Sequence, residues 1–396
     1  MTTGAARKAD ADLRTLRQRL HALAEPSGAE AATASLVAEE LARLRPSALL
    51  TGLGGHGVAA VFGNSGAAPG PTVLLRAELD AVAVPETLGV SHASRTPRTA
   101  HKCGHDGHMT ILLGVARRLA VGPPPAGRVV LLFQPAEETG AGAAAVAAEP
   151  RLRALAPDWL FALHNLPGYD AGRVLVRPGA FAAGSAGMRV RLSGRNAHAA
   201  QPEPGHSSDP ALNELIMALV TLPPPETGGA LALVTVTHAR LGDPSFGVAP
   251  GEADLLATLR SDDDRALDDL RRRATRAARA VARRHRLNCA ITWEEVFPVV
   301  WNDPLATALV RRVAVAEGLP LARPRESAFR WSEDFGVLAR LGKGALFGLG
   351  AGRRHPGLHA PEYDFNDDLL PIGISLLHRL AMAALQEPPV ARRRRR

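Results

Sequence analysis

The chain has 396 residues, of which 46 % are hydrophobic and 22 % are charged. This balance is typical of a globular protein and excludes a largely disordered or fibrous chain, and the length favours two domains or one large domain with an insertion. The formal net charge is +8, but the terminal run Arg392 to Arg396 supplies five of the 47 basic residues, so the rest of the chain has a charge of only +3. Because no zinc-finger, RRM or KH sequence accompanies this small excess, we expect no nucleic-acid partner.

No segment of the sequence predicts a membrane anchor or a secretion signal. There is no run of about eighteen apolar residues, and the N-terminal segment contains no apolar stretch of the kind found in signal peptides. Cys103 and Cys289 are too few for a disulfide framework, and Cys289 is expected to be a buried structural thiol. We therefore expect a cytoplasmic protein without a membrane partner.

The first part of the chain alternates between helical and strand patterns. Apolar residues recur at helical spacing from Asp10 to about Leu44, with an interruption at Pro26-Ser27-Gly28, which predicts two amphipathic helices. Strands that alternate with helices are typical of an α/β layer architecture. Short apolar runs bounded by Gly or Pro predict buried strands at 58–62, 73–75 and 129–133, and a helix is expected over 108–119.

The pattern changes near Gly184. Segments 188–192 and 232–236 alternate apolar and polar residues, as half-exposed strands do. Acidic residues at 262–264 open a long helix that we expect to reach about His285.

Eight arginines between Arg271 and Arg286 predict a solvated face of this helix, with a phosphate-binding groove as the less favoured alternative. Residues 185–296 are predicted to form a smaller α+β domain, inserted into a larger domain made of 1–184 and 297–388. The basic tail 389–396 is predicted to be disordered.

The densest group of reactive side chains lies between His101 and His108, where three histidines, one cysteine and one aspartate fall in eight residues. Imidazole and thiolate are the usual ligands of first-row transition metals. The step from Cys103 to His105 lets both groups reach one ion from a single turn. The alternative, a helix N-terminus with incidental polar residues, is disfavoured because the whole chain has only 14 histidines.

Three other motifs place polar residues where strands or loops end. Glu137 and Glu138 follow the apolar run 129–133, and strand ends are where sites form in open α/β sheets. One carboxylate could bind metal while the other acts as a base; a solvated Glu-Glu turn is the alternative. His164 follows the apolar run at 159–162 and His359 lies in a loop before the last helix, and either histidine taken alone is as well explained by a structural role.

The pooled motifs predict a dinuclear metal site. A structural zinc ion takes four protein ligands, and a single catalytic zinc ion takes three with a water. Five ligands fit two ions about 3.5–4 Å apart that share a water. The five candidates are Cys103, His105, Glu138, His164 and His359.

Seven ordered motifs resemble those of the dinuclear metallo-aminoacylase family, which includes N-acyl-amino-acid amidohydrolases, hippurate hydrolases and auxin-conjugate hydrolases. The match runs in the family's order from about residue 10 to residue 385, and its CGHDGH and PAEE sequences are highly specific. The motifs are LLRAELDAVAVPE, HKCGHDGHMTILLG, FQPAEETGAGA, LHNLPG, GRNAHAAQP, WSEDFG and GLHAPEYDFNDD.

The resemblance implies an α/β fold: a zinc-peptidase-like catalytic domain with a mixed sheet flanked by helices, interrupted by a lid domain of four strands and two helices that also pairs subunits into homodimers. It implies that the five candidates bind two divalent ions (zinc, manganese or cobalt) and that Glu137 is the general base. His198 matches the lid histidine that polarises the scissile carbonyl, in relatives often in the partner subunit's site. Asp80 matches an aspartate near the metals, and Glu333-Asp334-Phe335 matches a motif that supports the pocket.

Two segments depart from the family pattern. Glu78 stands where relatives commonly have an aspartate, and the stretch from Gln201 to Asp209 has a different sequence and is about two residues longer. We expect both changes to reshape the substrate pocket. The GxGxxG match from Gly52 to Gly57 is not a dinucleotide site, because a strand pattern follows it where that motif requires a helix.

We therefore expect a metal-dependent amidohydrolase that cleaves the amide bond of N-acyl amino acids or related small amides, with a water bridging the two ions and Glu137 taking its proton. The alternative among enzymes is a dipeptidase, aminopeptidase or carbamoyl-amide hydrolase on the same scaffold. The alternatives outside enzymes are a non-catalytic metal-binding protein and a nucleic-acid binder that uses the arginine-rich helix.

Overall fold

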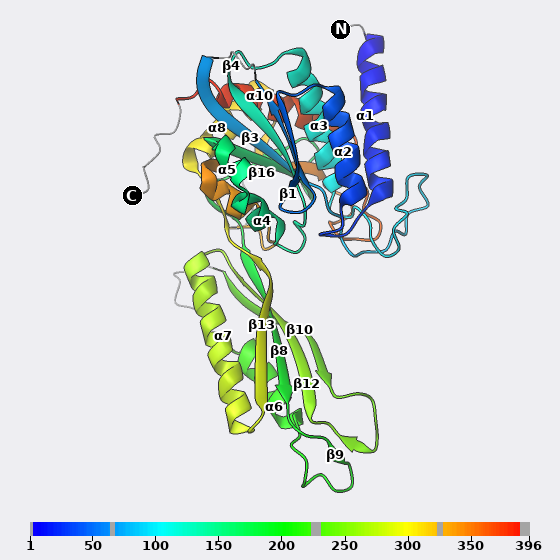
Figure 1. Ribbon diagram of the computed structural model, residues 1–396, viewed down its shortest axis with the longest axis vertical. Coiled ribbons are helices and arrows are strands. Elements are labelled where there is room, and N and C mark those ends of the chain that lie inside the picture. The colour runs from blue at the N-terminus through cyan, green and yellow to red at the C-terminus, as the bar shows by residue number, and fades with distance from the viewer. Residues whose placement is uncertain (1–2, 64–67, 223–230, 323–327, 389–396) are drawn as a thin grey trace. The chain divides into compact units, whose positions relative to one another are not determined.

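The computed structural model describes residues 3–63, 68–222, 231–322 and 328–388, so the predicted basic tail 389–396 lies outside the described residues. The chain forms two compact units (Figure 1). None of the described helices is long and apolar enough to cross a membrane. Unit 1 comprises Met1–Phe181, Val300–Glu326 and Asp334–Arg396, and unit 2 comprises Ala182–Val299 and Ser327–Glu333.

Unit 1 is built on a mixed sheet with the strand order β1-β2-β4-β3-β5-β16-β6-β15. The central strands β4, β3, β5 and β16 are parallel, whereas β1, β2 and β4 pair antiparallel. The strands are β1 (Ala48–Leu53), β2 (Gly57–Phe62), β3 (Ala68–Glu78), β4 (Ala126–Gln134), β5 (Trp159–Pro167), β6 (Val174–Leu175), β15 (Leu321–Ala322) and β16 (Lys343–Gly352), and β7 (Gly179–Ala182) pairs separately with β14 (Val300–Asn302).

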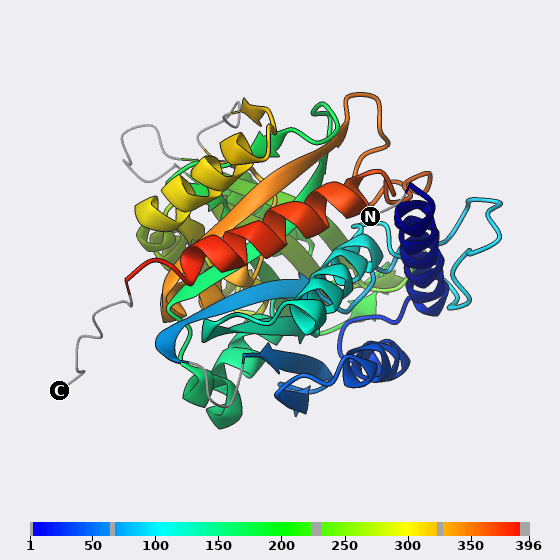
Figure 2. The ribbon, with the colours of Figure 1, turned by 90° about the horizontal axis from the view of Figure 1, so that it is seen from above.

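Helices cover this sheet. Figure 2 shows α3, α8 and α10 side by side over one face. Alternate residues of the same strands, such as Leu74 and Leu160, are equally buried, so the other face is covered too, where α4 contacts β4 and η1 contacts β5. The helices are α1 (Thr3–Leu23), α2 (Ala31–Arg43), α3 (His105–Val121), α4 (Gly142–Ala148), α5 (Pro150–Leu155), α8 (Pro304–Ala316), α9 (Phe335–Leu338), the 3₁₀ helix η1 (Ala339–Leu341) and α10 (Leu369–Ala384).

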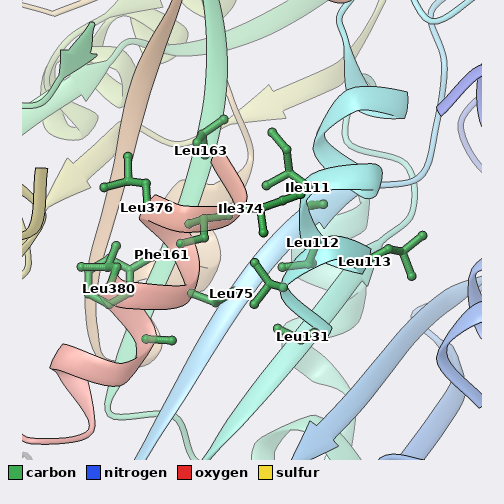
Figure 3. Packing of buried hydrophobic residues seen from close by; sticks show 14 of the residues in the cluster. Leu75, Ile111, Leu112, Leu113, Leu131, Phe161, Leu163, Ile374, Leu376 and Leu380 are labelled. Carbon is green, nitrogen blue, oxygen red and sulfur yellow. The ribbon is translucent and has the colours of Figure 1, made fainter. Parts of the chain in front are cut away.

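The core between this sheet and its helices is aliphatic. Leu75 and Leu131 on neighbouring strands pack with Ile111 of α3 and Ile374 of α10 (Figure 3). A Cβ atom at Gly114 would lie 2.3 Å from the Ile374 Cδ1 atom, so α3 and α10 approach closely only because this residue is glycine. The close packing fixes α3, and therefore the residues at its N-terminus, on the sheet.

Unit 2 has a four-stranded antiparallel sheet in the order β10-β12-β8-β13 and a two-stranded ribbon of β9 and β11. Val190, Leu192 and Leu255 face α6 and α7 and are buried, whereas Arg189 and Arg191 alternate with them and are exposed. The predicted half-exposed strands are therefore confirmed. The elements are β8 (Gly184–Ser193), β9 (Ala197–His198), α6 (Asp209–Val220), β10 (Ala232–Leu241), β11 (Val248–Ala249), β12 (Glu252–Ser261), α7 (Asp264–Arg284) and β13 (Asn288–Phe297).

The long helix of unit 2 begins and ends close to where the sequence predicts. The Asp263 carboxylate accepts a hydrogen bond from the Ala266 N–H at 2.8 Å and caps α7. The arginines of this helix are exposed or half-buried, which confirms the predicted solvated face. Cys289, predicted to be buried, is only half-buried because β13 is an edge strand.

The GxGxxG segment forms the turn between two antiparallel strands, β1 and β2. It is not followed by a helix whose N-terminus could receive a pyrophosphate. The strand that the sequence predicts directly after this motif is therefore confirmed.

Candidate metal centre

Three neighbouring parallel strands end at one edge of the unit 1 sheet. In the order β4-β3-β5, Glu137 and Glu138 follow β4, Asp80 follows β3, and His164 lies near the end of β5. The carboxyl ends of parallel strands meet at the same edge, which is where sites form in open α/β sheets. These four side chains therefore converge although they are far apart in sequence.

A left-handed turn at Gly104 starts α3 at His105, three residues before the predicted start at 108. Gly104 has a φ angle of 93°, and a Cβ atom there would lie 2.5 Å from Asn165 Oδ1 and 2.6 Å from the Tyr363 hydroxyl. The predicted start was wrong because these tertiary contacts, and not apolar periodicity, set the helix N-terminus. His105 therefore lies on the first helical turn.

The orientation of the His105 ring follows from one hydrogen bond. Its Nδ1 lies 2.8 Å from the Asp80 carbonyl oxygen, which can only accept, so this nitrogen carries the proton. Its Nε2 faces the carboxylates of Glu137 and Glu138 at 3.9 and 3.8 Å. A bond of this kind commonly orients a histidine whose other nitrogen binds a metal.

Buried carboxylates hold the turn that carries Glu137 and Glu138. Ala136 has a φ angle of 51°, a left-handed conformation that is uncommon for residues with a Cβ atom. Its N–H donates to Glu30 Oε1 at 2.8 Å, and the Glu138 N–H donates to Asp80 Oδ2 at 2.9 Å. These two bonds fix the backbone of the turn from which both glutamate side chains extend toward His105.

His359 is held by the segment that precedes α3. Its backbone N–H donates to the Lys102 carbonyl oxygen at 2.8 Å. The buried Lys102 ammonium donates to Glu86 at 2.6 Å and to the Tyr363 carbonyl oxygen at 2.9 Å. The His359 Nε2 then lies 3.6 Å from Glu138 Oε1.

All five candidate ligands converge in unit 1, and we call them the donor cluster: Cys103, His105, Glu138, His164 and His359. Their donor atoms include two groups, Cys103–His105–His164 and Cys103–Glu138–His359, and within each group all atoms lie within 4.8 Å of one another. The Cys103 sulfur, which is 3.5 Å from His164 Nε2, belongs to both groups. The geometry thus offers two adjacent sites that share a thiol.

The predicted base and the predicted lid histidine lie in different units. Glu137 is buried beside the donor cluster, and its Oε1 accepts from the Asp334 N–H at 3.4 Å. His198 belongs to β9 of unit 2, where its side chain is exposed.

Burial and negative neighbours dominate the electrostatics of the cluster. Burial, followed by the Glu138 and Glu137 carboxylates, raises the pKa of the Cys103 thiol well above its ordinary 9.0. Burial alone would lower the pKa of His105, but Glu78 and Glu138 outweigh it and raise that pKa above 6.5. Both shifts keep protons on buried donors, a condition that a bound cation would reverse.

The donor set fits divalent metal ions. Three buried polar atoms, His105 Nε2, Glu138 Oε1 and Asp80 Oδ1, have no hydrogen-bond partner within the described part of the chain. Leaving one such atom unsatisfied costs about 1–3 kcal/mol, and the first two face each other at 3.8 Å. Thiolate, imidazole and carboxylate are the ligands that zinc and similar ions take.

A fully buried network around Arg76 borders the cluster. The Arg76 guanidinium donates to Glu78, to Asp334 Oδ1 at 2.7 Å and to Gln134 Oε1 at 3.0 Å. The second Glu78 oxygen lies 2.8 Å from His108 Nδ1. Burial opposes ionisation of Glu78, but Arg76 and His108 hold its pKa well below 4.5. Glu78 thus belongs to the buried framework, so the departure from the family pattern at this position changes a support of the site.

This network reaches both the predicted base and a predicted ligand. Asp334 contacts Glu137 through its backbone N–H. His108 Nε2 lies 2.7 Å from Asn165 Oδ1, next to His164, and the Asn165 amide donates to the Tyr363 hydroxyl at 2.6 Å. A change in one member therefore propagates to the positions of Glu137 and His164.

Several residues that hold the site were not identified from the sequence. The Ser27 hydroxyl donates to Asp80 at 2.6 Å, and nothing in the local sequence predicts this contact. Arg17 and His21 do have a signal, because they stand at i and i+4 on the apolar face of the first predicted helix. In the structure both are buried, and they contact Asp106 at 3.0 and 2.8 Å.

Comparison with known proteins places the chain among metal-dependent hydrolases of amides. The family model described as peptidase family M20/M25/M40 matches residues 74–383. An N-acetyl-L-cysteine deacetylase of Bacillus subtilis is 30 % identical over 326 residues, which cover 81 % of this chain and 76 % of the relative. The IAA-amino acid hydrolase ILR1-like 4 of Arabidopsis thaliana is 30 % identical over 384 residues, which cover 94 % of this chain and 85 % of the relative.

A solved structure shares the fold. It is the YXEP protein of Bacillus subtilis, described as a dinuclear metal binding peptidase from the M20 family. The TM-score is 0.78 at 23 % identity, and the match covers 96 % of this chain and 99 % of the other. The resemblance found in the sequence motifs is confirmed by the family match, and the α/β fold with a separate smaller sheet domain by this structure.

Replacement of Glu78 by glutamine should lower the free energy of unfolding of the enzyme by about 3 kcal/mol at pH 7, because it leaves a buried cation short of its partner. Since the folded pKa of Glu78 is depressed, its contribution is complete above 4.5 and is lost as the pH falls through the folded value. Urea denaturation at several pH values measures the difference, with Glu39→Gln, an exposed carboxylate of α2, as the control. A difference that does not shrink at low pH would contradict the charge pairing.

Proposed function

The chain belongs to peptidase family M20/M25/M40, and we propose that it is a metal-dependent amidohydrolase that releases an amino acid from its N-acyl derivative. The observation that carries the proposal is the convergence of five metal-binding side chains on two groups that share Cys103, with the buried carboxylate of Glu137 beside them. A binding protein without activity would need the ligands but not the adjacent base. The presence of both supports an enzyme.

Cys103, His105 and His164 would hold one divalent ion, and Cys103, Glu138 and His359 would hold the other. Zinc, manganese and cobalt all suit these ligands, and the thiolate favours the softer ions. When bound, such ions lower the pKa of a coordinated water and polarise a carbonyl oxygen.

Glu137 is proposed as the general base. The oxygen of the attacking water forms a bond to the acyl carbon while its proton moves to the Glu137 carboxylate. When the carbon–nitrogen bond breaks, Glu137 gives this proton to the leaving amine. The hydrogen bond from the Asp334 N–H holds one carboxylate oxygen, which leaves the other directed at the cluster.

His198 is proposed to stabilise the negative charge that develops on the acyl oxygen. Its Nδ1 lies 3.1 Å from the Ala200 N–H, which can only donate, so the ring proton is on Nε2. The exposed Nε2–H is therefore available to donate to a substrate oxygen. A fixed donor of this kind contributes as an oxyanion hole does.

The relatives support N-acyl amino acids as the substrate class. The deacetylase of Bacillus subtilis is named for the removal of an acetyl group from N-acetyl-L-cysteine. The hydrolase of Arabidopsis thaliana is named for the hydrolysis of an IAA–amino acid conjugate. Both names describe an acyl group joined to an amino acid through an amide bond. Activity toward a panel of N-acyl amino acids would identify the acyl group and the amino acid that this chain prefers.

Unit 2 is proposed to pair two copies of the chain into a homodimer. β10 lies at the edge of its sheet, where unpaired backbone groups can accept another strand. Leu233 and Leu241 on this strand, and Met217 and Val220 on the contacting helix α6, are large exposed apolar residues. An edge strand that has exposed apolar side chains on it and on a contacting helix is suited to self-association.

Substitution of Glu137 by glutamine should lower kcat at least about 100-fold, because the shape is kept and the base is lost. Free-amine release from N-acetyl, N-benzoyl and longer N-acyl amino acids, with dipeptides and carbamoyl amides alongside, measures both activity and substrate class. Glu39→Gln is the control. Turnover of dipeptides alone would favour a peptidase on the same scaffold, and a loss well under 100-fold would contradict the role of Glu137.

Substitution of Cys103 by alanine should remove at least one of the two bound ions per chain, because this thiol belongs to both groups of donors. Elemental analysis of the purified protein measures the metal content. The matched control is Cys289→Ala, the other cysteine, which lies in unit 2. Unchanged metal content in Cys103→Ala would contradict the ligand assignment.

A mixed dimer tests whether His198 serves the partner's site. One subunit would have Glu137→Gln and the other His198→Ala, with different affinity tags to isolate the mixed species. If the histidine acts across the dimer, one of the two sites has both intact groups, and about half of the wild-type activity per dimer is expected. If it acts within its own chain, neither site is complete and no activity returns.

A further inference from the structure

An exposed aromatic residue, Phe246, lies two residues before Val248 in unit 2. Strand β9 lies at one end of this unit (Figure 1), and its pairing with β11 puts Val248 opposite His198. The pairing continues one step further, because the Ala199 N–H donates to the Gly247 carbonyl oxygen at 3.0 Å. Phe246 therefore lies in the short segment that leads into the strand opposite His198.

The base of the ribbon is also fixed. The Gly194 N–H donates to the Gly251 carbonyl oxygen, and the Gly251 N–H donates to Asn196 Oδ1, both at 2.6 Å. These bonds join the chain before β9 to the chain after β11. Phe246, Val248 and His198 consequently move together as one element.

The apolar side chains of this ribbon have no place in the core of unit 2. Phe246 is the most exposed large apolar residue in the part of the chain that the structure describes, and Val248 is also exposed. The apolar core of the unit lies between the sheet and α6 and α7 and does not include them. Burial of a phenylalanine side chain is worth about 1.5–3 kcal/mol, which this position forgoes unless another molecule or another part of the assembly covers it.

We propose that Phe246, with Val248 beside it, is a specificity-determining contact for the acyl group of the substrate. The inference rests on the proposed function, in which His198 donates to the acyl oxygen. Directly opposed residues of two strands have Cβ atoms about 4.5–5.5 Å apart, and diagonal neighbours lie about 7–8 Å apart, which is still within reach of an aromatic side chain. Val248 is opposite His198 and Phe246 lies two residues before Val248, so a substrate whose carbonyl contacts His198 has its acyl chain within reach of both side chains. The ribbon supplies the apolar surface that the acyl chain requires.

The ligand class that this contact favours is an N-acyl amino acid with a large apolar acyl group, either aromatic or a chain of several carbons. An acetyl group has a single methyl and cannot extend to the ring. A hydrophobic contact discriminates by about 10- to 200-fold for each carbon or two that it gains or loses. The expected effect of Phe246 is therefore on the ratio between large and small acyl groups.

The experiment compares kcat/KM for the N-benzoyl, N-octanoyl and N-acetyl derivatives of one amino acid in the full-length, metal-loaded enzyme. In Phe246→Ala the preference for the large acyl groups over acetyl should fall at least about 10-fold, mainly through KM. Phe246→Leu should restore most of the preference because it keeps an apolar side chain. The matched control is Val315→Ala, an exposed apolar residue of α8 in unit 1, which should leave the preference unchanged.

The outcomes separate this inference from the function on which it rests. Wild-type turnover with an unchanged acyl preference in Phe246→Ala would overturn the inference alone. An equal loss for all acyl groups, together with dissociation of the dimer in sedimentation, would assign Phe246 to the subunit interface and overturn it as well. If the wild-type enzyme turned over none of the N-acyl amino acids, both the proposed function and this inference would be overturned.

Discussion

Buried charge has to be paired, and in unit 1 the pairing is organised around the first turn of α3. Successive residues on a helix point about 100° apart, so His105, Asp106 and His108 face three different neighbours. His105 faces the donor cluster, Asp106 contacts Arg17 at 3.0 Å, and His108 contacts Glu78 at 2.8 Å. Asp106 and Glu78 are each balanced by a buried arginine, Arg17 for Asp106 and Arg76 for Glu78. In the third direction the donor atoms face one another in the manner that a metal ion satisfies.

The two charged networks also determine where the distant ends of the chain lie. Arg17 of the first helix contacts Asp106 and also Asp364, 2.6 Å away in the segment after His359. Burial opposes ionisation of this arginine, but Asp106 and Asp364 outweigh it and raise its pKa above its ordinary value of 12.5, so the guanidinium keeps its charge. The Lys102 carbonyl oxygen accepts a hydrogen bond from the His359 N–H. The segment before α3 therefore also holds His359, the last candidate ligand in chain order. The precision of the cluster is therefore a property of pairings over long sequence separations.

The sequence predicts what is local or what a motif specifies, and the structure adds what depends on contacts between distant residues. Helix α7 is predicted well because its Asp263 cap, its acidic start and its arginine-rich face are all local features. The start of α3 is not, because it depends on Asn165 and Tyr363 crowding Gly104 from other parts of the chain. The five candidate ligands could be predicted together because they lie at strand ends or in the recognised sequence motifs. The hydrogen bond from Ser27 to Asp80 could not be predicted, because a serine in a helix break has many equally probable partners.

The division into two units separates two demands that conflict in a single core. The donor cluster must be rigid, and the Arg76 network that borders it is buried, so breaking an ion pair in that network costs about 3–5 kcal/mol of stability. The contacts that select an acyl group must be able to vary between relatives without such a cost. The exposed ribbon meets this need, because the hydrogen bonds that hold it, mainly between backbone groups and from Gly251 to the Asn196 side chain, do not involve the side chain at position 246. If unit 2 contacts the acyl group as proposed, specificity can change at position 246 while the donor cluster of unit 1 stays constant.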